Sequence, residues 1–171
     1  MLVLETERLA VRQLNLDDAA FVLQLLNEPS FLQNIGDKGV RTETDAREYL
    51  RTGPMASYDT HGFGLYLVVL RTTEEPIGIC GLRKRDALED ADIGFALLPE
   101  FWSQGYAREA ASAIIAYARE TLGLSRMVAI VSPHNAVSIS LLERLGLVFE
   151  ERVRLSETAP QVLLYAMDLA T

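Results

Sequence analysis

The chain has 171 residues, 49% hydrophobic and 23% charged, which is the length and composition of one soluble globular domain spanning residues 1–171. Its net charge of −8 argues against a nucleic-acid partner, since phosphate binding needs a basic surface; the charge suits a cationic amine substrate, or simply keeps the protein soluble. One cysteine and two histidines are too few for an internal disulfide or a structural zinc site, which favours a reducing cytoplasmic location and no metal.

The composition of residues 1–8 is not that expected of a signal peptide. Residues 1–8 become acidic at the fifth position, whereas a signal peptide begins with basic residues followed by an apolar run. No apolar stretch approaches the about 18 residues that a membrane span requires. We therefore expect no membrane partner.

The first third of the chain predicts one strand and two helices. Leu9 and Val11, with the flanking Arg8 and Arg12, recur at a period of two, which is typical of a strand. Asn15 can cap a helix that Pro29 ends. Residues 42–45 have the form of a capping box and predict a second, short helix, which the Gly-Pro pair at 53–54 stops.

The next elements are predicted strands. Apolar runs at 65–70 and 77–82, joined by a polar turn, indicate a hairpin. A charged loop follows, and a third apolar run takes residues 92–98.

In the second half of the chain the spacing of the apolar residues changes. Apolar side chains first recur at helical spacing and afterwards form a continuously apolar strand, as expected when both faces of a strand are covered. A second helix and two last strands complete the chain. These elements are predicted over residues 107–122, 127–131, 135–145, 149–155 and 162–167.

The junction between the strand at 92–98 and the long helix is a candidate anion site. Free backbone N–H groups at such a junction, with the helix dipole behind them, suit a pyrophosphate, and Gly105 and Ala107 let the phosphates approach. Other nucleotide and hydrolase motifs are absent. The chain has no G-x-x-x-x-G-K-[ST] and no G-x-S-x-G, and its only G-x-G, at 62–64, precedes a strand instead of opening a helix.

Several motifs follow one another around this junction: Asp92 to Phe95, Leu98-Pro99, Phe101-Trp102, Gln104 to Ala107, Asn135, Ser138 and Leu145-Gly146. Their order, with further likeness at 4–9 and 164–168, resembles the GCN5-related N-acetyltransferase (GNAT) superfamily. Within it, the chain is most similar to the ribosomal-protein N-acetyltransferase branch of the RimJ/RimL type. The resemblance implies an α/β (α+β) fold, with a mixed, mostly antiparallel central sheet that splays at the cofactor cleft and carries helices on both faces.

The resemblance implies an acetyl-CoA-dependent N-acetyltransferase. Such an enzyme transfers an acetyl group to an amine, here a small molecule or a protein N-terminus, by direct attack of the amine on the thioester. It would act as a monomer or homodimer. A non-catalytic acyl-CoA-binding sensor or subunit is the alternative.

The resemblance also implies where coenzyme A binds. Its pantetheine would pair with the backbone at 96–98, and its pyrophosphate would meet a loop whose family pattern matches at Gly105 and Ala107. Trp102 departs from the wider superfamily pattern, as is usual in the RimJ/RimL branch, and Ser103 replaces a frequent glycine. The residues implied in cofactor binding are Ala96, Leu97, Leu98, Ser103, Gln104, Gly105, Tyr106, Ala107, Arg108 and Asn135.

Two residues are implied in catalysis. Asp92 matches a position where family members often carry a catalytic Glu; as a base it needs its pKa raised, by burial or by neighbours such as Asp90. The alternative is that Asp92 only ends a solvated acidic loop. The family's usual acid, a tyrosine, falls at Leu142, so Ser138 is the nearest hydroxyl for the departing sulfur, unless it is simply a polar first-turn residue.

Two further residues have predicted roles. Asn135 can cap the helix that it opens and, by the resemblance, hold the pantetheine arm. Cys80 is expected to be a buried apolar residue, not a nucleophile.

Overall fold

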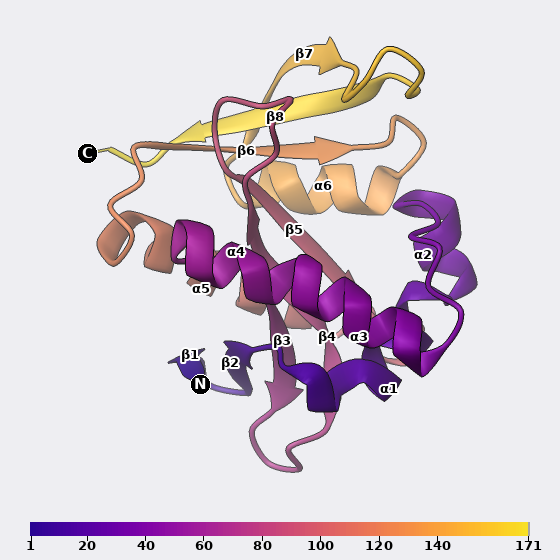
Figure 1. Cartoon of the computed structure of the whole chain (residues 1–171). Helices are drawn as coiled ribbons and strands as arrows, with labels where there is room; N and C mark the ends of the chain where they lie inside the picture. Colours follow the sequence, from indigo (N-terminus) through magenta and orange to yellow (C-terminus); the bar gives the residue numbers. More distant parts are fainter. Residues whose placement is uncertain (171) are drawn as a thin grey trace.

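The computed structural model describes residues 1–170, and its centre is one sheet of eight strands in the order β1-β2-β3-β4-β5-β6-β8-β7 (Figure 1). Neighbouring strands are antiparallel except β5 and β6, which are parallel. The predicted mixed, mostly antiparallel sheet is therefore confirmed. The strands are β1 (Leu2–Glu5), β2 (Leu9–Gln13), β3 (Leu65–Leu70), β4 (Pro76–Arg83), β5 (Asp92–Leu97), β6 (Arg126–Val131), β7 (Val148–Val153) and β8 (Val162–Asp168).

Helices cover both faces of this sheet. On one face, α1 (Ala19–Leu26) and α3 (Glu43–Thr52) pack on alternate residues of the central strands, such as Leu67 and Ile79. On the other face, α5 (Tyr106–Glu120) and α6 (Ala136–Arg144) bury their apolar sides. Two further helices complete the layer on the first face around α3, namely α2 (Pro29–Asn34) and α4 (Pro54–His61).

Both predicted helix caps are present. The Asn15 side chain accepts a hydrogen bond from the next turn, which is a 3-10 turn (Leu16–Asp18) that leads into α1. Thr42 and Asp45 form the predicted capping box at the start of α3. These local hydrogen bonds satisfy N–H groups that the first turn of a helix leaves free, so the sequence alone places them well.

Two helices end where the sequence predicts, and two unpredicted helices follow them. α3 stops at Thr52 with Gly53 as its C-cap, and α1 ends at Leu26, before Pro29; Pro29 and Pro54 then begin α2 and α4. A first-turn proline loses no hydrogen bond, because the N–H at that position has no partner within the helix. Strand β1 was not predicted either; it is a four-residue edge strand with an irregular register to β2, and Leu2 is exposed.

The parallel pair at the middle of the sheet is incomplete. Asp92 pairs with Val128, and the Val128 amide donates to the Ala91 carbonyl over 3.0 Å. Beyond this point β5 continues along β4 while β6 continues along β8, and no further β5–β6 pairing is found within the described chain. We call this unpaired boundary the split; it is the predicted splay.

No helix among residues 1–170 has the length and apolar character to cross a membrane.

Gly78 sets how closely β4 and β5 approach. A Cβ at Gly78 would lie 2.3 Å from the Ala96 carbonyl oxygen and 2.8 Å from the Leu97 Cα. We expect Gly78→Ala to lower the free energy of unfolding by about 1–3 kcal/mol, because the clash is with backbone that cannot rotate away. Urea titration followed by circular dichroism measures the change.

Gly94→Ala is the matched control for this substitution. A Cβ at Gly94 meets only the Leu65 Cδ2 atom, at 3.8 Å, which is an ordinary contact. We expect the free energy of unfolding of Gly94→Ala to lie within about 0.5 kcal/mol of that of the parent protein. Equal stability of both variants would contradict the proposed close approach of β4 and β5.

Candidate functional site

The loop before α5 presents a row of free backbone donors. Ser103 and Gly105 have φ values of 62° and 82°, so the chain turns twice through the left-handed region before the helix begins. The backbone N–H groups of residues 103–108 donate no hydrogen bond within the described chain. No side chain caps α5. Consecutive N–H groups at the positive end of a 15-residue helix form a site for a phosphate or another anion.

The side chains of this loop leave its backbone N–H groups uncovered. Ser103, Gln104 and Gly105 are exposed, and the Gln104 amide turns back to donate to the Glu100 carbonyl over 3.1 Å. Tyr106 and Ala107 are half-buried, and Arg108 is exposed on the first turn of α5. The loop can therefore bind an anion through its backbone, as the sequence predicts for residues 103–108.

The beginning of the chain holds this loop in place. Arg8 donates to the Gln104 carbonyl over 2.9 Å and to Glu109 of α5 over 2.7 Å, and its guanidinium lies 4.3 Å from the Tyr106 ring centre. Thr6 donates to the second Glu109 oxygen. Although desolvation acts to raise it, these hydrogen bonds hold the pKa of Glu109 below its ordinary value.

Sequence reasoning did not identify Arg8 and Glu109 as parts of the site. They lie 101 residues apart in the chain and meet only in the fold. The resemblance included the segment at 4–9, which was the only signal pointing to this contact.

Trp102 connects the same loop to the end of β5 through a hydrogen bond. Its indole N–H donates to the Leu97 carbonyl over 3.0 Å. The Leu98 amide donates to the Ile77 carbonyl of the β4 side over 2.9 Å, so by strand alternation Ala96 also faces β4. Of the three predicted pantetheine positions at 96–98, Leu97 is the one whose backbone points away from β4 and toward the split.

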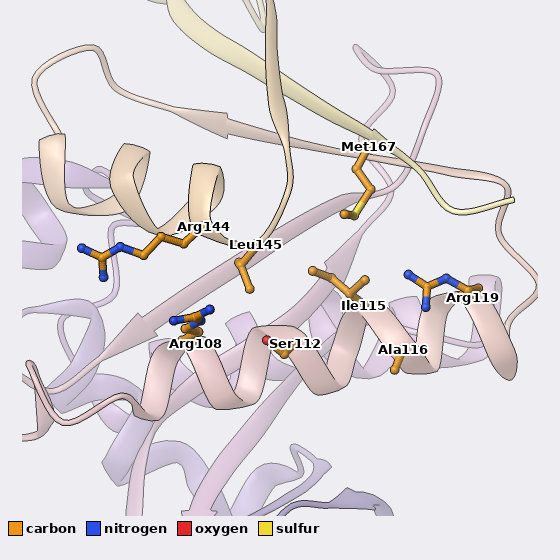
Figure 2. Close-up of a pocket in the computed structure, with 8 residues that line it drawn as sticks. All are labelled: Arg108, Ser112, Ile115, Ala116, Arg119, Arg144, Leu145 and Met167. Carbon is orange, nitrogen blue, oxygen red and sulfur yellow. The ribbon is translucent and has the colours of Figure 1, made fainter. Parts of the chain in front are cut away.

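A shallow pocket adjoins the first turn of α5. It measures about 200 Å³ and lies between α5, the end of α6 and Met167 of β8 (Figure 2). Arg108, Arg119 and Arg144 border it, and Figure 2 shows their guanidinium groups distributed along its length. In a chain with a net charge of −8, this basic border continues the anion site formed by the loop.

Asp92 is buried at the point where the split begins. Only 2% of its surface is exposed, and the Arg85 Nε lies 3.2 Å and 3.3 Å from its two carboxylate oxygens. Burial raises the pKa of Asp92, although Arg85 and Arg83 act in the opposite direction. Asp90, which was expected to assist this shift, pairs instead with Arg126 over 3.1 Å. The Asp92 side chain is therefore buried and not solvated, and its role as a base stays a prediction.

The second core helix positions Asn135 and Ser138 together. The Asn135 side chain caps α6 by accepting from the Ser138 amide over 3.3 Å, as predicted. Ser138 is half-buried, and its hydroxyl makes no hydrogen bond to another described residue. Leu142, at the position of the family tyrosine, is buried in the main core and is 2% exposed, so a ring there would have to displace packed side chains.

Other reactive side chains lie outside this arrangement. Cys80 is fully buried, and desolvation raises the pKa of its thiol to about 12, which confirms the prediction of a buried apolar residue. His61 stacks on Phe63, and His134 is exposed. Among residues 1–170, no group of three or more His, Cys, Asp or Glu side chains is arranged to hold a metal ion.

Comparison with known proteins identifies the same family over most of the chain. Residues 8–148 match the family described as "Acetyltransferase (GNAT) domain". A relative in Bacillus licheniformis, the uncharacterized N-acetyltransferase p20, is 31% identical over 160 residues, covering 93% of this chain and 89% of that protein.

Solved structures share the fold. The acetyltransferase from Agrobacterium tumefaciens is 27% identical, with a TM-score of 0.80 over 96% of this chain and 92% of that one. RimL, an L7/L12 alpha-N-protein acetyltransferase solved in complex with coenzyme A, superposes with a TM-score of 0.84 over 98% of both chains at 18% identity. At that identity the likeness concerns the fold alone.

Gly105→Val tests the anion site. A branched side chain there narrows the approach to the free N–H groups. It also places a residue with a Cβ in the left-handed region, where that Cβ would lie 3.3 Å from the Arg8 guanidinium. We expect the affinity for acetyl-CoA to fall at least about tenfold, or ~1.4 kcal/mol, as measured by isothermal titration calorimetry.

Gly123→Val controls for backbone strain in this test. Gly123 follows α5 at its other end with φ of 67°, and no atom lies within 4 Å of an added Cβ. It introduces similar strain away from the loop and should leave acetyl-CoA affinity unchanged. If both variants bind acetyl-CoA like the parent, the loop is not the phosphate site.

Glu109→Gln tests whether the Arg8 contacts order the loop. Removing the charge weakens the bonds to Arg8 and Thr6, and since Arg8 is 42% exposed we expect a modest effect. Acetyl-CoA affinity should fall about fivefold, corresponding to ~1 kcal/mol. Glu150→Gln, which removes an arginine partner at the other end of the sheet, should bind normally. Unchanged affinity in Glu109→Gln would separate Arg8 from the site.

Proposed function

The chain belongs to the GNAT acetyltransferase family and is an acetyl-CoA-dependent acyltransferase, and from this we propose that it acetylates an amine by direct attack of the amine on the thioester. The acceptor amine belongs to a small molecule or a protein N-terminus, and the active unit is one domain spanning residues 1–171. One observation supports this most. Six consecutive free N–H groups lie at one end of β5, and a buried carboxylate lies at its other end beside the split.

The loop and its arginines would hold the acetyl donor. Acetyl-CoA supplies a thioester carbonyl that an amine can attack. The backbone of residues 103–108 is suited to its pyrophosphate, and Arg108 and Arg144 lie beside the loop for further phosphate contact. The Leu97 carbonyl already accepts from Trp102 and the Asn135 Oδ1 from Ser138, so Leu97 offers its amide and Asn135 its Nδ2 to the pantetheine arm.

Asp92 is the residue we assign to proton removal. The amine nitrogen attacks the thioester carbonyl carbon, the C–N bond forms, the C–S bond breaks, and the amine proton passes to the Asp92 carboxylate directly or through water. A lysine-like amine with a pKa of about 10.4 is rarely neutral at pH 7, which costs about 4.6 kcal/mol, whereas an α-amine costs only about 1.1 kcal/mol. The α-amine has the lower pKa of the two, so a carboxylate whose pKa is raised by burial removes its proton more easily than that of a lysine-like amine.

Ser138 is the proposed donor to the departing sulfur. Its hydroxyl is half-buried on the first turn of α6 and is not engaged by another described side chain. A thiolate with a pKa near 8.5 leaves readily, so a single hydrogen bond that strengthens as charge develops on sulfur is sufficient.

Release of free CoA is the direct test of acetyl transfer. The protein is incubated with acetyl-CoA and a panel of amines, and thiol release above the blank is followed with a chromogenic reagent, while mass spectrometry identifies acetylated products. A non-catalytic acyl-CoA-binding sensor would bind acetyl-CoA in calorimetry without any amine-dependent thiol release.

Asp92→Asn tests the base. We expect turnover at pH 7 to fall by roughly 10²–10⁴-fold and to recover in part at high pH, where the amine loses its proton unaided. The parent enzyme should lose activity as pH falls through the Asp92 pKa, which burial shifts upward, because the protonated carboxyl no longer accepts a proton. Steady-state kinetics across pH measures both effects.

Asp90→Asn is the control for the loss of a nearby carboxylate. Asp90 lies two residues away and pairs with Arg126. It should retain the turnover and pH profile of the parent. Normal turnover of Asp92→Asn at neutral pH would remove Asp92 from the mechanism.

A further inference from the structure

A cluster of basic side chains surrounds Asp92 on the face of the sheet opposite α5. Arg83 is the residue directly opposite Asp92 in the β4–β5 register, so the two side chains share a face. Arg85 binds Asp92 through its Nε. Lys38, in the segment after α2, is close enough for Arg83, Arg85 and Asp92 to influence its pKa. We call these four residues the acceptor cluster.

The segment that carries Lys38 is held against the open side of the sheet. At its start, the Asn34 carbonyl accepts from the Ser132 hydroxyl, just beyond the end of β6, over 3.2 Å. At its end, the Val40 carbonyl accepts from the Asn27 amide over 2.9 Å. The segment thus runs from the β6 side of the split to the helices that cover the β4 side.

The acceptor cluster has more cations than its own residues neutralise. Three basic groups surround one carboxylate. Arg85 uses its Nε for Asp92, and its two terminal nitrogens make no hydrogen bond to the described chain. Arg83 and Lys38 have neither an ion pair nor a side-chain hydrogen bond among residues 1–170. The chain has 24 acidic residues for 16 basic ones, so acids are not scarce; they are simply not placed here.

Two of these cations are also partly removed from water. Arg83 is half-buried, and Arg85 is 23% exposed, whereas Lys38 is exposed. Desolvation lowers the pKa of Arg83, and repulsion from Arg85 adds to it. An anion bound between them would relieve both effects, since it replaces lost water contacts and neutralises the mutual repulsion.

The anion is not a phosphate of the acetyl donor. Asp92 begins β5 and the phosphate loop follows its other end, and six residues of strand separate them by roughly 17 Å. The faces differ as well. Ile93 and Leu97 pack on the α5 side, whereas Ala96, which alternates with them as Asp92 does, packs toward α1 and α3. The acceptor cluster therefore faces the side from which a second substrate can approach the split.

We propose that the acceptor cluster binds the acceptor and selects a small amine that also carries a carboxylate, with its amino group at Asp92 and its carboxylate at Arg83 and Lys38. This inference rests on the proposed acetyl transfer. It reverses the simplest expectation from the net charge of −8, which favours a cationic amine. The overall charge describes the whole surface, while the substrate meets only the local field of these side chains.

Matched acceptor pairs test the proposal. Free amino acids are compared with their carboxamides, a linear polyamine and a short peptide, and kcat/KM is measured by thiol release. Each carboxamide differs from its amino acid by one charge and has the less basic amine, so chemistry alone favours the carboxamide. We expect the opposite order, with at least a tenfold preference for the carboxylate form.

Variants locate that preference. Arg83→Gln and Lys38→Gln should each raise KM for the carboxylate form by roughly tenfold to a hundredfold, while KM for acetyl-CoA stays unchanged. Arg83→Lys keeps the charge and should restore part of the preference. Lys38 lies on an exposed segment, so we expect Lys38→Gln to fold normally and to test the proposal even if Arg83→Gln folds poorly. Arg152→Gln, an exposed arginine on β7, is the control and should behave like the parent.

Each contrary outcome has a distinct meaning. Preference for the carboxamide, the polyamine or the peptide overturns the proposed selectivity and leaves acetyl transfer intact. Preserved carboxylate preference in both Arg83→Gln and Lys38→Gln also overturns it, because the selecting charge would then lie elsewhere. If acetyl-CoA binds in calorimetry but none of the amines tested releases thiol, the proposed acetyl transfer is contradicted, and the proposed selectivity, which rests on it, is contradicted as well.

Discussion

The arrangement of this protein depends on a pair of parallel strands that are joined at one position. β5 and β6 meet at Asp92 and Val128 and then follow different neighbours. A fully paired boundary would use the backbone groups of both strands. Because it is unpaired, the Leu97 amide has no partner strand on the side of the split, while the Leu97 carbonyl accepts from the Trp102 indole. The loop of residues 103–108 lies at one end of β5 and the buried Asp92 carboxylate at the other, so the proposed chemistry is organised along a single strand.

Charge is distributed in a way that the net value conceals. Most acidic residues with ionic partners hold the framework together: Asp18 binds Arg12, and Glu150 binds Arg126. Five of the basic residues left without such partners lie at two places: Arg108, Arg119 and Arg144 border the pocket beside α5, and Arg83 and Lys38 belong to the acceptor cluster. An acidic protein can thereby present two locally basic surfaces, which we propose for the acetyl donor and the acceptor.

The phosphate loop shows how distant segments create a rigid anion site. Two left-handed residues, Ser103 and Gly105, aim the N–H groups, but such a conformation persists only when surrounding contacts enforce it. Arg8 supplies those contacts from the start of the chain by binding both the Gln104 carbonyl and Glu109. Trp102 adds a bond to β5 from the other side. The loop is therefore held by the turn between β1 and β2 and by the end of β5.

The sequence by itself determined what local chemistry controls. The caps at Asn15 and Thr42, the hairpin of β3 and β4, and the glycine-containing loop before α5 follow from hydrogen bonds and backbone preferences within a few residues, and the family motifs indicated the splayed sheet. Tertiary structure decided the rest. Arg8 came to lie against Glu109, 101 residues away, and Asp92 became buried where β5 meets β6 at Val128. Both outcomes depend on a neighbour that is distant in the chain, and burial and ion pairing are properties of that neighbourhood, not of the residue.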